Sequence, residues 1–179
     1  MTSETKGYDR TSRVLHWSVA AIVIGLFASG FWMVDLSYYS SWYRTAPFWH
    51  KSVGVLLFLM MGYRVLWRLL NGTATPLASH SKAVQRVSHL THLLLYVLIF
   101  LIICSGYLIS TADGRPIEVF GLFDLPSAGE LFAEQADRAG VVHKFAAYGL
   151  IALAVIHALA ALKHHFFDKD ETLKRMLNP

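Results

Sequence analysis

Four long apolar stretches divide the chain. Residues 14–34, 87–112 and 145–162 contain no Asp, Glu, Lys or Arg, and the remaining stretch, residues 47–70, contains three basic residues. Each stretch is close to the roughly 20 residues that a helix needs to cross the hydrocarbon core of a bilayer. The pattern therefore predicts an all-α fold, a transmembrane four-helix bundle that forms a single membrane domain over residues 1–179. The expected spans are residues 13–35, 47–70, 87–112 and 141–167.

The longest connection is the loop over residues 113–140, on the side opposite the termini. Its apolar part, residues 117–123, is expected to pack as a lid over the mouth of the bundle. Ser127 followed by Glu130 has the spacing of a capping box, which predicts a short helix over residues 127–138.

Composition and charge agree with a membrane protein. Hydrophobic residues make up 55% of the 179 residues and charged residues 16%, against about 25% charged in an ordinary soluble domain. The single cysteine excludes a disulfide framework. Eleven of the sixteen Lys and Arg residues lie in the two tails and around the connection between the second and third spans, so the positive-inside rule places both termini in the cytoplasm. A net charge of +4 divided in this way fits an anionic lipid surface and indicates no nucleic-acid partner.

Four of the nine histidines form two pairs. His143 and His157 share one helical face and are separated by a rise of about 21 Å, so they lie near opposite ends of the fourth span. His50 begins the second span at the outer end, and His16 begins the first span at the inner end. Two facing imidazoles are the ligands of a six-coordinate haem b. The pairs His50/His143 and His16/His157 therefore predict two haems b, which are non-covalent because no Cys-x-x-Cys-His motif is present.

Other interpretations of the histidines stay open. His92 and His89 begin the third span at the depth of His16 and compete with it as the inner ligand; we favour His16, because the third span has no outer histidine. Intramembrane histidines also hydrogen-bond neighbouring helices or carry protons in a transporter or channel. A separate metal site in the tail is a further alternative, with the candidate ligands His164, His165, Asp168 and Asp170.

Basic side chains near the histidines are candidates for pairing with haem propionates. Arg64 and Arg68 lie on the helical face of His50, displaced toward the cytoplasm, and an Arg side chain pairs well with a carboxylate. Lys51 and Lys144 directly follow the two outer histidines. His92 is a further candidate for contact with a propionate. The alternative for all of the basic residues is snorkelling at the membrane boundary.

Several motifs resemble the bacterial cytochrome b561 family. They are Arg-Val-Leu-His-Trp at residues 13–17, His-Lys-Ser-Val-Gly at residues 50–54, the spacing from His143 to His157, and the ending over residues 164–176. The resemblance covers nearly the whole chain. It implies a four-helix di-haem oxidoreductase of the bacterial cytoplasmic (inner) membrane that exchanges electrons with quinone.

One branch of that family passes electrons from periplasmic superoxide to ubiquinone. The similar layout makes superoxide:ubiquinone oxidoreductase the leading specific activity, with a small periplasmic redox protein as the alternative donor. A haem b subunit of a larger enzyme, or quinol oxidation in the reverse direction, is also consistent with the resemblance. The candidate quinone-binding residues are His92, Lys163, His164 and His165.

Overall fold

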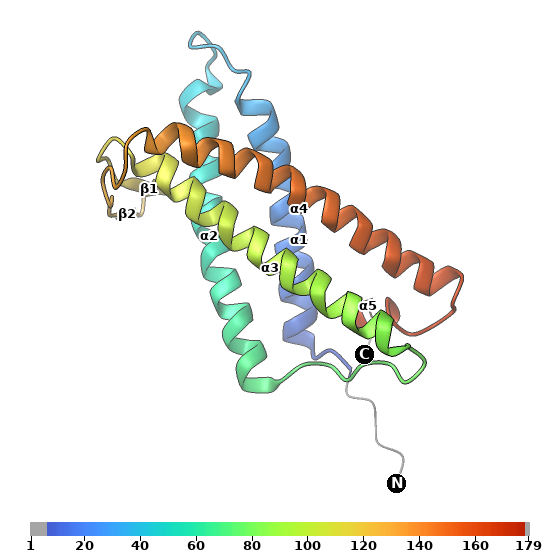
Figure 1. The fold of residues 1–179 in the computed structure, drawn as a ribbon. Helices are drawn as coiled ribbons and strands as arrows, with labels where there is room; N and C mark the ends of the chain where they lie inside the picture. The colour runs from blue at the N-terminus through green and yellow to red at the C-terminus, as the bar shows by residue number, and fades with distance from the viewer. Residues whose placement is uncertain (1–6, 178–179) are drawn as a thin grey trace.

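The structure, a computed structural model, describes residues 7–177 and is mostly helical (Figure 1). Among these residues, four helices are long and apolar enough to cross a membrane. This confirms the expected transmembrane four-helix bundle. The helices are α1 (Arg10–Met33), α2 (Trp42–Asn71), α3 (Lys82–Thr111) and α4 (Gln135–Phe166), and a short α5 (Lys174–Leu177) follows.

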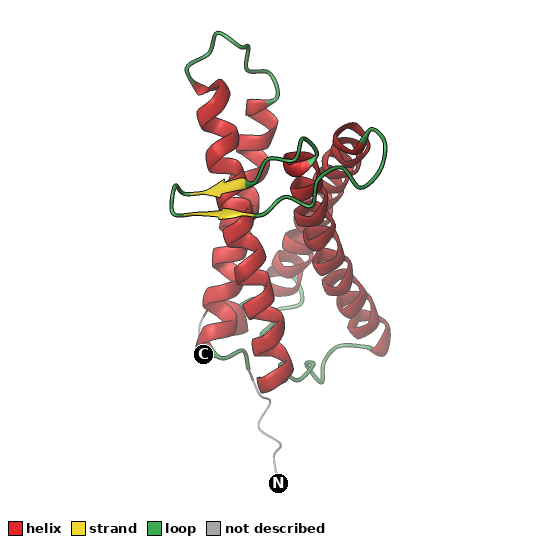
Figure 2. Cartoon of the chain, turned by 90° about the vertical axis from the view of Figure 1, so that its left-hand side faces the viewer, coloured by secondary structure: helices red, strands yellow, loops and turns green. Residues whose placement is uncertain are grey.

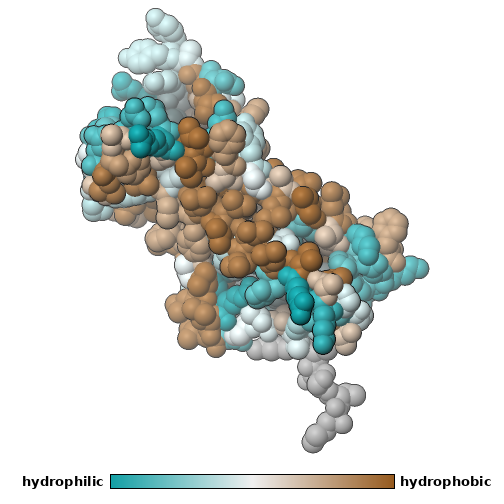
Figure 3. All heavy atoms as spheres, in the orientation of Figure 1, coloured by the Kyte–Doolittle hydropathy of each residue, from teal (hydrophilic) through white to brown (hydrophobic). Residues whose placement is uncertain are grey.

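The four long helices form two antiparallel hairpins. Helix α1 packs mainly on α2, and α3 packs mainly on α4, whereas α1 and α4 approach each other much less. Figure 1 shows the two hairpins crossing at an angle, with the start of α1 and the short α5 at the same end of the bundle. Apolar side chains cover the middle of the surface and polar ones gather toward its ends (Figure 3), as the bilayer requires.

The buried core lies where all four helices meet. It consists of Val19 from α1, Leu57 and Met61 from α2, Ile99 from α3 and Leu150 from α4. Leu150 is midway along the sequence between His143 and His157. The core therefore separates the outer ends of the helices from the inner ends.

The outer loop differs from the sequence-based expectation. It contains a two-stranded antiparallel hairpin, β1 (Ile117–Val119) and β2 (Phe123–Leu125), that lies against α2 (Figure 2). Ile117 and Val119 are buried, and the Ser52 hydroxyl of α2 accepts a hydrogen bond from the Phe120 amide at 3.0 Å. The apolar stretch is thus ordered by contact with α2, close to His50.

The predicted helix over residues 127–138 is wrong. Helix α4 begins only at Gln135. The Ser127 hydroxyl accepts from the Gly129 amide at 2.9 Å and donates to the Thr111 carbonyl at 2.9 Å, so it forms a turn rather than a helix cap. Gly129 has a φ of 71°, in the left-handed region that glycine tolerates and that ends regular helix.

The end of the chain crosses the inner end of the bundle. Trp17 of α1 donates its indole N–H to the Met176 carbonyl at 3.0 Å, and Arg13 donates to the Leu177 carbonyl at 3.3 Å. Arg175 donates to the carbonyl of Thr75 at 2.9 Å, in the connection between α2 and α3. The tail is therefore held against α1 and against the connection between α2 and α3.

Candidate functional site

The structure brings the two outer histidines together. His50 of α2 and His143 of α4 lie with ring centres 6.3 Å apart and planes at 67°. Each residue comes from a different hairpin, so the pair bridges the interface between the hairpins. Both side chains are half-buried.

A serine and a carbonyl hold the ring of His143. Ser105 Oγ donates to the Leu101 carbonyl at 2.7 Å and lies 3.2 Å from His143 Nδ1. The Ile102 carbonyl lies 3.0 Å from the same Nδ1. A carbonyl only accepts hydrogen bonds, so Nδ1 carries the proton and Nε2 keeps its lone pair. That is the tautomer in which Nε2 binds a metal while Nδ1–H is held by a neighbouring group.

His50 is held in the same way. Ser29 Oγ donates to the Leu26 carbonyl at 3.1 Å, and its lone pair accepts from His50 Nδ1 at 3.1 Å. The Nε2 lone pair of His50 is therefore available as well. Both outer rings are prepared for ligation through the same nitrogen.

A glycine follows each of these serines and lies against the same ring. A Cβ at Gly30 would lie 3.2 Å from His50 Cε1, and a Cβ at Gly106 would lie 3.1 Å from His143 Cε1. No side chain fits at either position without moving the imidazole. The roles of Ser29, Gly30, Ser105 and Gly106 were not predicted from the sequence, although a Ser-Gly pair occurs in two of the apolar spans and could have indicated them.

Three histidines meet at the inner end. His16 of α1 and His157 of α4 have ring centres 6.4 Å apart, and His92 of α3 lies 5.3 Å from the ring centre of His157. Two imidazoles that bind one metal ion from opposite sides have ring centres roughly 6 Å apart, because each bond is about 2 Å and the nitrogen lies about 1.1 Å from its ring centre. The separations of the pairs His50/His143 and His16/His157 fit this arrangement, whereas the separation of His92 from His157 is too short for it.

The basic residues are distributed differently between the two ends. Arg64 donates to the Tyr96 hydroxyl at 2.9 Å and lies 3.3 Å from His16 Nδ1. The Arg68 guanidinium lies 6.0 Å from the centre of the Tyr96 ring. Both arginines thus belong to the inner end, Arg64 beside His16 and both around Tyr96. At the outer end, neither Lys51 nor Lys144 makes an ion pair within residues 7–177.

The residues proposed for quinone from the sequence lie in two places. His92 contacts His157. The Lys163 ammonium lies 2.6 Å from Asp168 Oδ2, and the His165 ring packs on the ring of Phe166.

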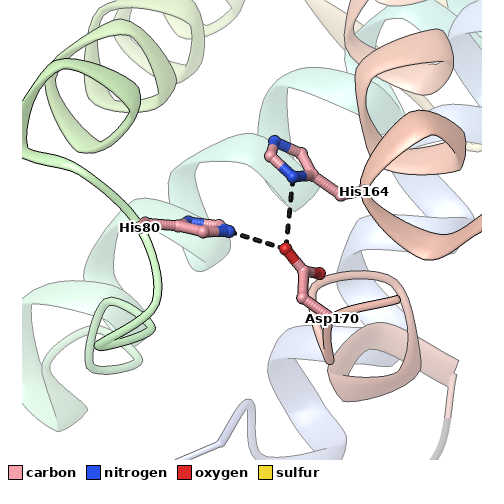
Figure 4. A group of neighbouring side chains, drawn as sticks. All are labelled: His80, His164 and Asp170. Atoms are coloured by element: carbon pink, nitrogen blue, oxygen red, sulfur yellow. Dashed lines mark hydrogen bonds and ion pairs between the residues drawn. The ribbon is translucent and has the colours of Figure 1, made fainter. Parts of the chain in front are cut away.

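His164, the fourth of these residues, joins a group that links three segments of the chain. His80, in the connection between α2 and α3, pairs with Asp170 of the tail at 2.8 Å, and His164 Nδ1 lies 3.2 Å from the same carboxylate oxygen (Figure 4). Burial raises the pKa of Asp170, but hydrogen bonds from His80 and Thr172 outweigh burial and hold that pKa at about 2. The predicted tail ligands included His165 and not His80, whereas the structure groups His80 with His164 and Asp170.

Comparison with known proteins agrees with the geometry. The family model described as "Prokaryotic cytochrome b561" matches residues 7–179. The chain is 50% identical over 176 residues to "Cytochrome b561 homolog 2" of Escherichia coli (strain K12), an alignment that covers 98% of this chain and 94% of the relative. It is 29% identical over 177 residues to "Probable superoxide oxidase CybB" of Yersinia pestis, covering 96% of each. It is 28% identical over 188 residues to "Cytochrome b562" of Cereibacter sphaeroides, covering 100% of this chain and 99% of the relative.

Proposed function

The chain belongs to the prokaryotic cytochrome b561 family, a family of haem b electron-transfer proteins of bacterial membranes, and from this premise we propose that it binds two haems b and carries electrons across the membrane. The observation that carries the proposal is the pair of ring-centre separations, 6.3 Å at the outer end and 6.4 Å at the inner end. Each pair joins the two hairpins, which make few contacts of their own between α1 and α4.

The chain's own residues bind and orient both groups. His50 and His143 would hold the outer haem, and His16 and His157 would hold the inner one. Ser29 and Ser105 keep the outer Nδ1 atoms protonated, so that the Nε2 lone pairs would be free to bind the iron. Haem b, when bound in this way, supplies one-electron redox chemistry.

The cations divide between the two ends. Arg64 and Arg68 would pair with the propionates of the inner haem, because both guanidinium groups lie around Tyr96, next to His16. Lys51 and Lys144 serve the outer group, since each directly follows an outer ligand and is not engaged in an ion pair within the described residues. His92 supports the inner site from α3, where its short distance to His157 disfavours it as a ligand.

We propose superoxide as the donor and ubiquinone as the acceptor. Two superoxide ions each give up one electron and leave as O₂, while ubiquinone takes up two electrons and two protons to become ubiquinol. The printed name of the Yersinia pestis relative supports this donor. The positive-inside rule supports an orientation with both termini in the cytoplasm, which puts His50 and His143 at the periplasmic end.

Ubiquinone is proposed to bind near the inner end. The candidate residues are His92, Lys163, His164 and His165. Of these, Lys163 is paired with Asp168, whereas His165 has a buried Nδ1 without a hydrogen-bond partner among the described residues. An imidazole ring nitrogen can donate a proton to a reduced quinone.

The test is rapid mixing of purified, oxidised protein with superoxide, with and without ubiquinone, while haem absorbance is followed. We expect two haems per chain, reduction by superoxide, and reoxidation only when ubiquinone is present. Two haems that superoxide does not reduce would refute the donor but leave electron transfer intact. A purified protein without a haem absorption band would refute the whole proposal.

The second candidate function is that of a haem b subunit serving another redox protein. The observation that favours it is the exposed tip of the outer hairpin, where Leu122 is 79% and Phe123 52% exposed. Copurification of a second polypeptide that is lost when Leu122 is changed to Ser would support this function. Quinol oxidation in the reverse direction uses the same residues, and haem reduction by added ubiquinol would reveal it.

A further inference from the structure

The group formed by His80, His164 and Asp170 has the composition of a metal site. Its three candidate ligand atoms, one from each residue, all lie within 4.8 Å of one another. Asp170 Oδ2 lies 2.8 Å from His80 Nε2 and 3.2 Å from His164 Nδ1. In a tetrahedral zinc site with bonds of about 2.0–2.1 Å, neighbouring ligand atoms lie roughly 3.3 Å apart. The atoms are thus almost in place, and Figure 4 shows the two rings and the carboxylate converging.

His164 Nδ1 shows that hydrogen bonding alone does not account for the group. This nitrogen is buried and has no aligned hydrogen-bond partner. Two carboxylate oxygens nevertheless lie close to it, Asp168 Oδ2 at 2.8 Å and Asp170 Oδ2 at 3.2 Å. Short distances without alignment are the arrangement expected when donor atoms face a common point rather than each other.

The surroundings orient the carboxylate of Asp170. The Thr172 amide donates to Oδ1 at 2.8 Å, which leaves Oδ2 directed at the two histidines. Such hydrogen bonds to the second oxygen are typical of carboxylates that bind metals. Asp168 lies outside the group of three and is neutralised by Lys163 at 2.6 Å.

We propose that His80, His164 and Asp170 bind a divalent transition metal ion, with zinc as the fitting member of the class. Two imidazole nitrogens and one carboxylate oxygen are ligands that zinc accepts, and the side chains are only 11% to 19% exposed, so the ion would be shielded but reachable. His164 follows the inner ligand His157 by two helical turns, about 10 Å along α4. The site is therefore separate from the haem sites. It shares His164 with the residues proposed for quinone, but zinc binding is measured without quinone.

Such an ion would join the connection between α2 and α3, the end of α4 and the tail. The experiment uses the full-length, haem-loaded protein in detergent with its purification tag removed. Zinc is titrated against a chromophoric chelator, and bound zinc per chain is measured after desalting. The variants are His80→Ala and Asp170→Asn, and the matched control is His165→Ala, which removes the neighbouring histidine outside the group.

We expect about one zinc per wild-type chain and the same affinity in His165→Ala. Loss of a group that merely supports a ligand costs about 10–100-fold in metal affinity, so each variant in the group should weaken binding by at least about tenfold. Unchanged haem absorbance would show that the variants fold. If His80→Ala does not fold, zinc X-ray absorption of the wild-type protein decides the matter, since it reports two imidazoles and an oxygen ligand. A wild-type protein that binds no zinc, or a His165→Ala variant that loses zinc as strongly as the others, would overturn the proposal.

Discussion

Substitution of Gly106 by Ala tests whether the outer ring needs the glycine beside it. The added Cβ would lie 3.1 Å from His143 Cε1 and 3.3 Å from His143 Nδ1, where ordinary contacts begin at 3.4 Å. The imidazole would have to move by about 0.3 Å, a shift typical of overpacked sites. Hydrogen-bonding groups oppose that movement, since Ser105 and Ile102 hold Nδ1 at 3.2 and 3.0 Å.

The magnitude follows from two opposing effects. Overpacking of this kind costs about 1–3 kcal/mol. Ala in place of Gly in a helix interior returns up to about 1 kcal/mol of helix stability, but that gain is the same with and without haem. The displacement of His143 weakens haem binding. A cost of about 1–3 kcal/mol corresponds to roughly a 5- to 150-fold loss of affinity for haem.

The assay is the number of haems per chain in the purified protein, together with a redox titration. We expect Gly106→Ala to lose part or all of the outer haem while the inner one keeps its spectrum and potential. Gly25→Ala is the matched control, because Gly25 is exposed and a Cβ there would meet nothing within 4 Å. Full retention of both haems with unchanged potentials in Gly106→Ala would refute the reasoning, as would loss of the inner haem instead.

Three further predictions concern ligand choice and pH. His143→Ala should leave one haem per chain, and two haems would show that the pairing is wrong. His92→Ala should keep both, since its ring lies too close to His157 for the two to bind one metal ion from opposite sides; loss of the inner haem would make it a ligand in place of His16. Burial raises the pKa of Asp9, but hydrogen bonds from Ser12 and Trp67 outweigh burial and lower it. Asp9→Ala should therefore lower the melting temperature at neutral pH, with a difference that vanishes as the pH falls below about 4; a difference that persists in acid would contradict this assignment.

The four spans and the histidine pairs could be predicted because their signals are local. A charge-free run shows a span without reference to any other part of the chain, and the spacing of His143 and His157 fixes one face of one helix. Ser29 and Ser105, which hold the rings of His50 and His143, were missed because each lies on the other helix of its hairpin. Ser105 has a role only once α3 is packed against α4.

Arg64 shares a helical face with His50 and lies toward the cytoplasm, as expected, and the antiparallel packing of α1 on α2 brings it to His16. Two other features could not be predicted, because the fold decides which partner a side chain meets. Ser127 matches a capping pattern, but its hydroxyl is used by Gly129 and Thr111, so no helix begins there. His80 was not among the predicted tail ligands, because its partner, Asp170, lies 90 residues further along the sequence and meets it only through the fold of the tail.

The rise of about 21 Å between His143 and His157 also determines how the membrane potential acts on the protein. This rise is roughly two-thirds of a hydrocarbon core of about 30 Å. Moving one charge across the whole membrane changes its energy by about 2.3 kcal/mol per 100 mV. Moving an electron between the two histidine pairs therefore changes its energy by up to about 1.6 kcal/mol per 100 mV. In the proposed orientation the cytoplasmic side is negative. An energised membrane therefore opposes electron flow from the outer pair to the inner pair and favours the return.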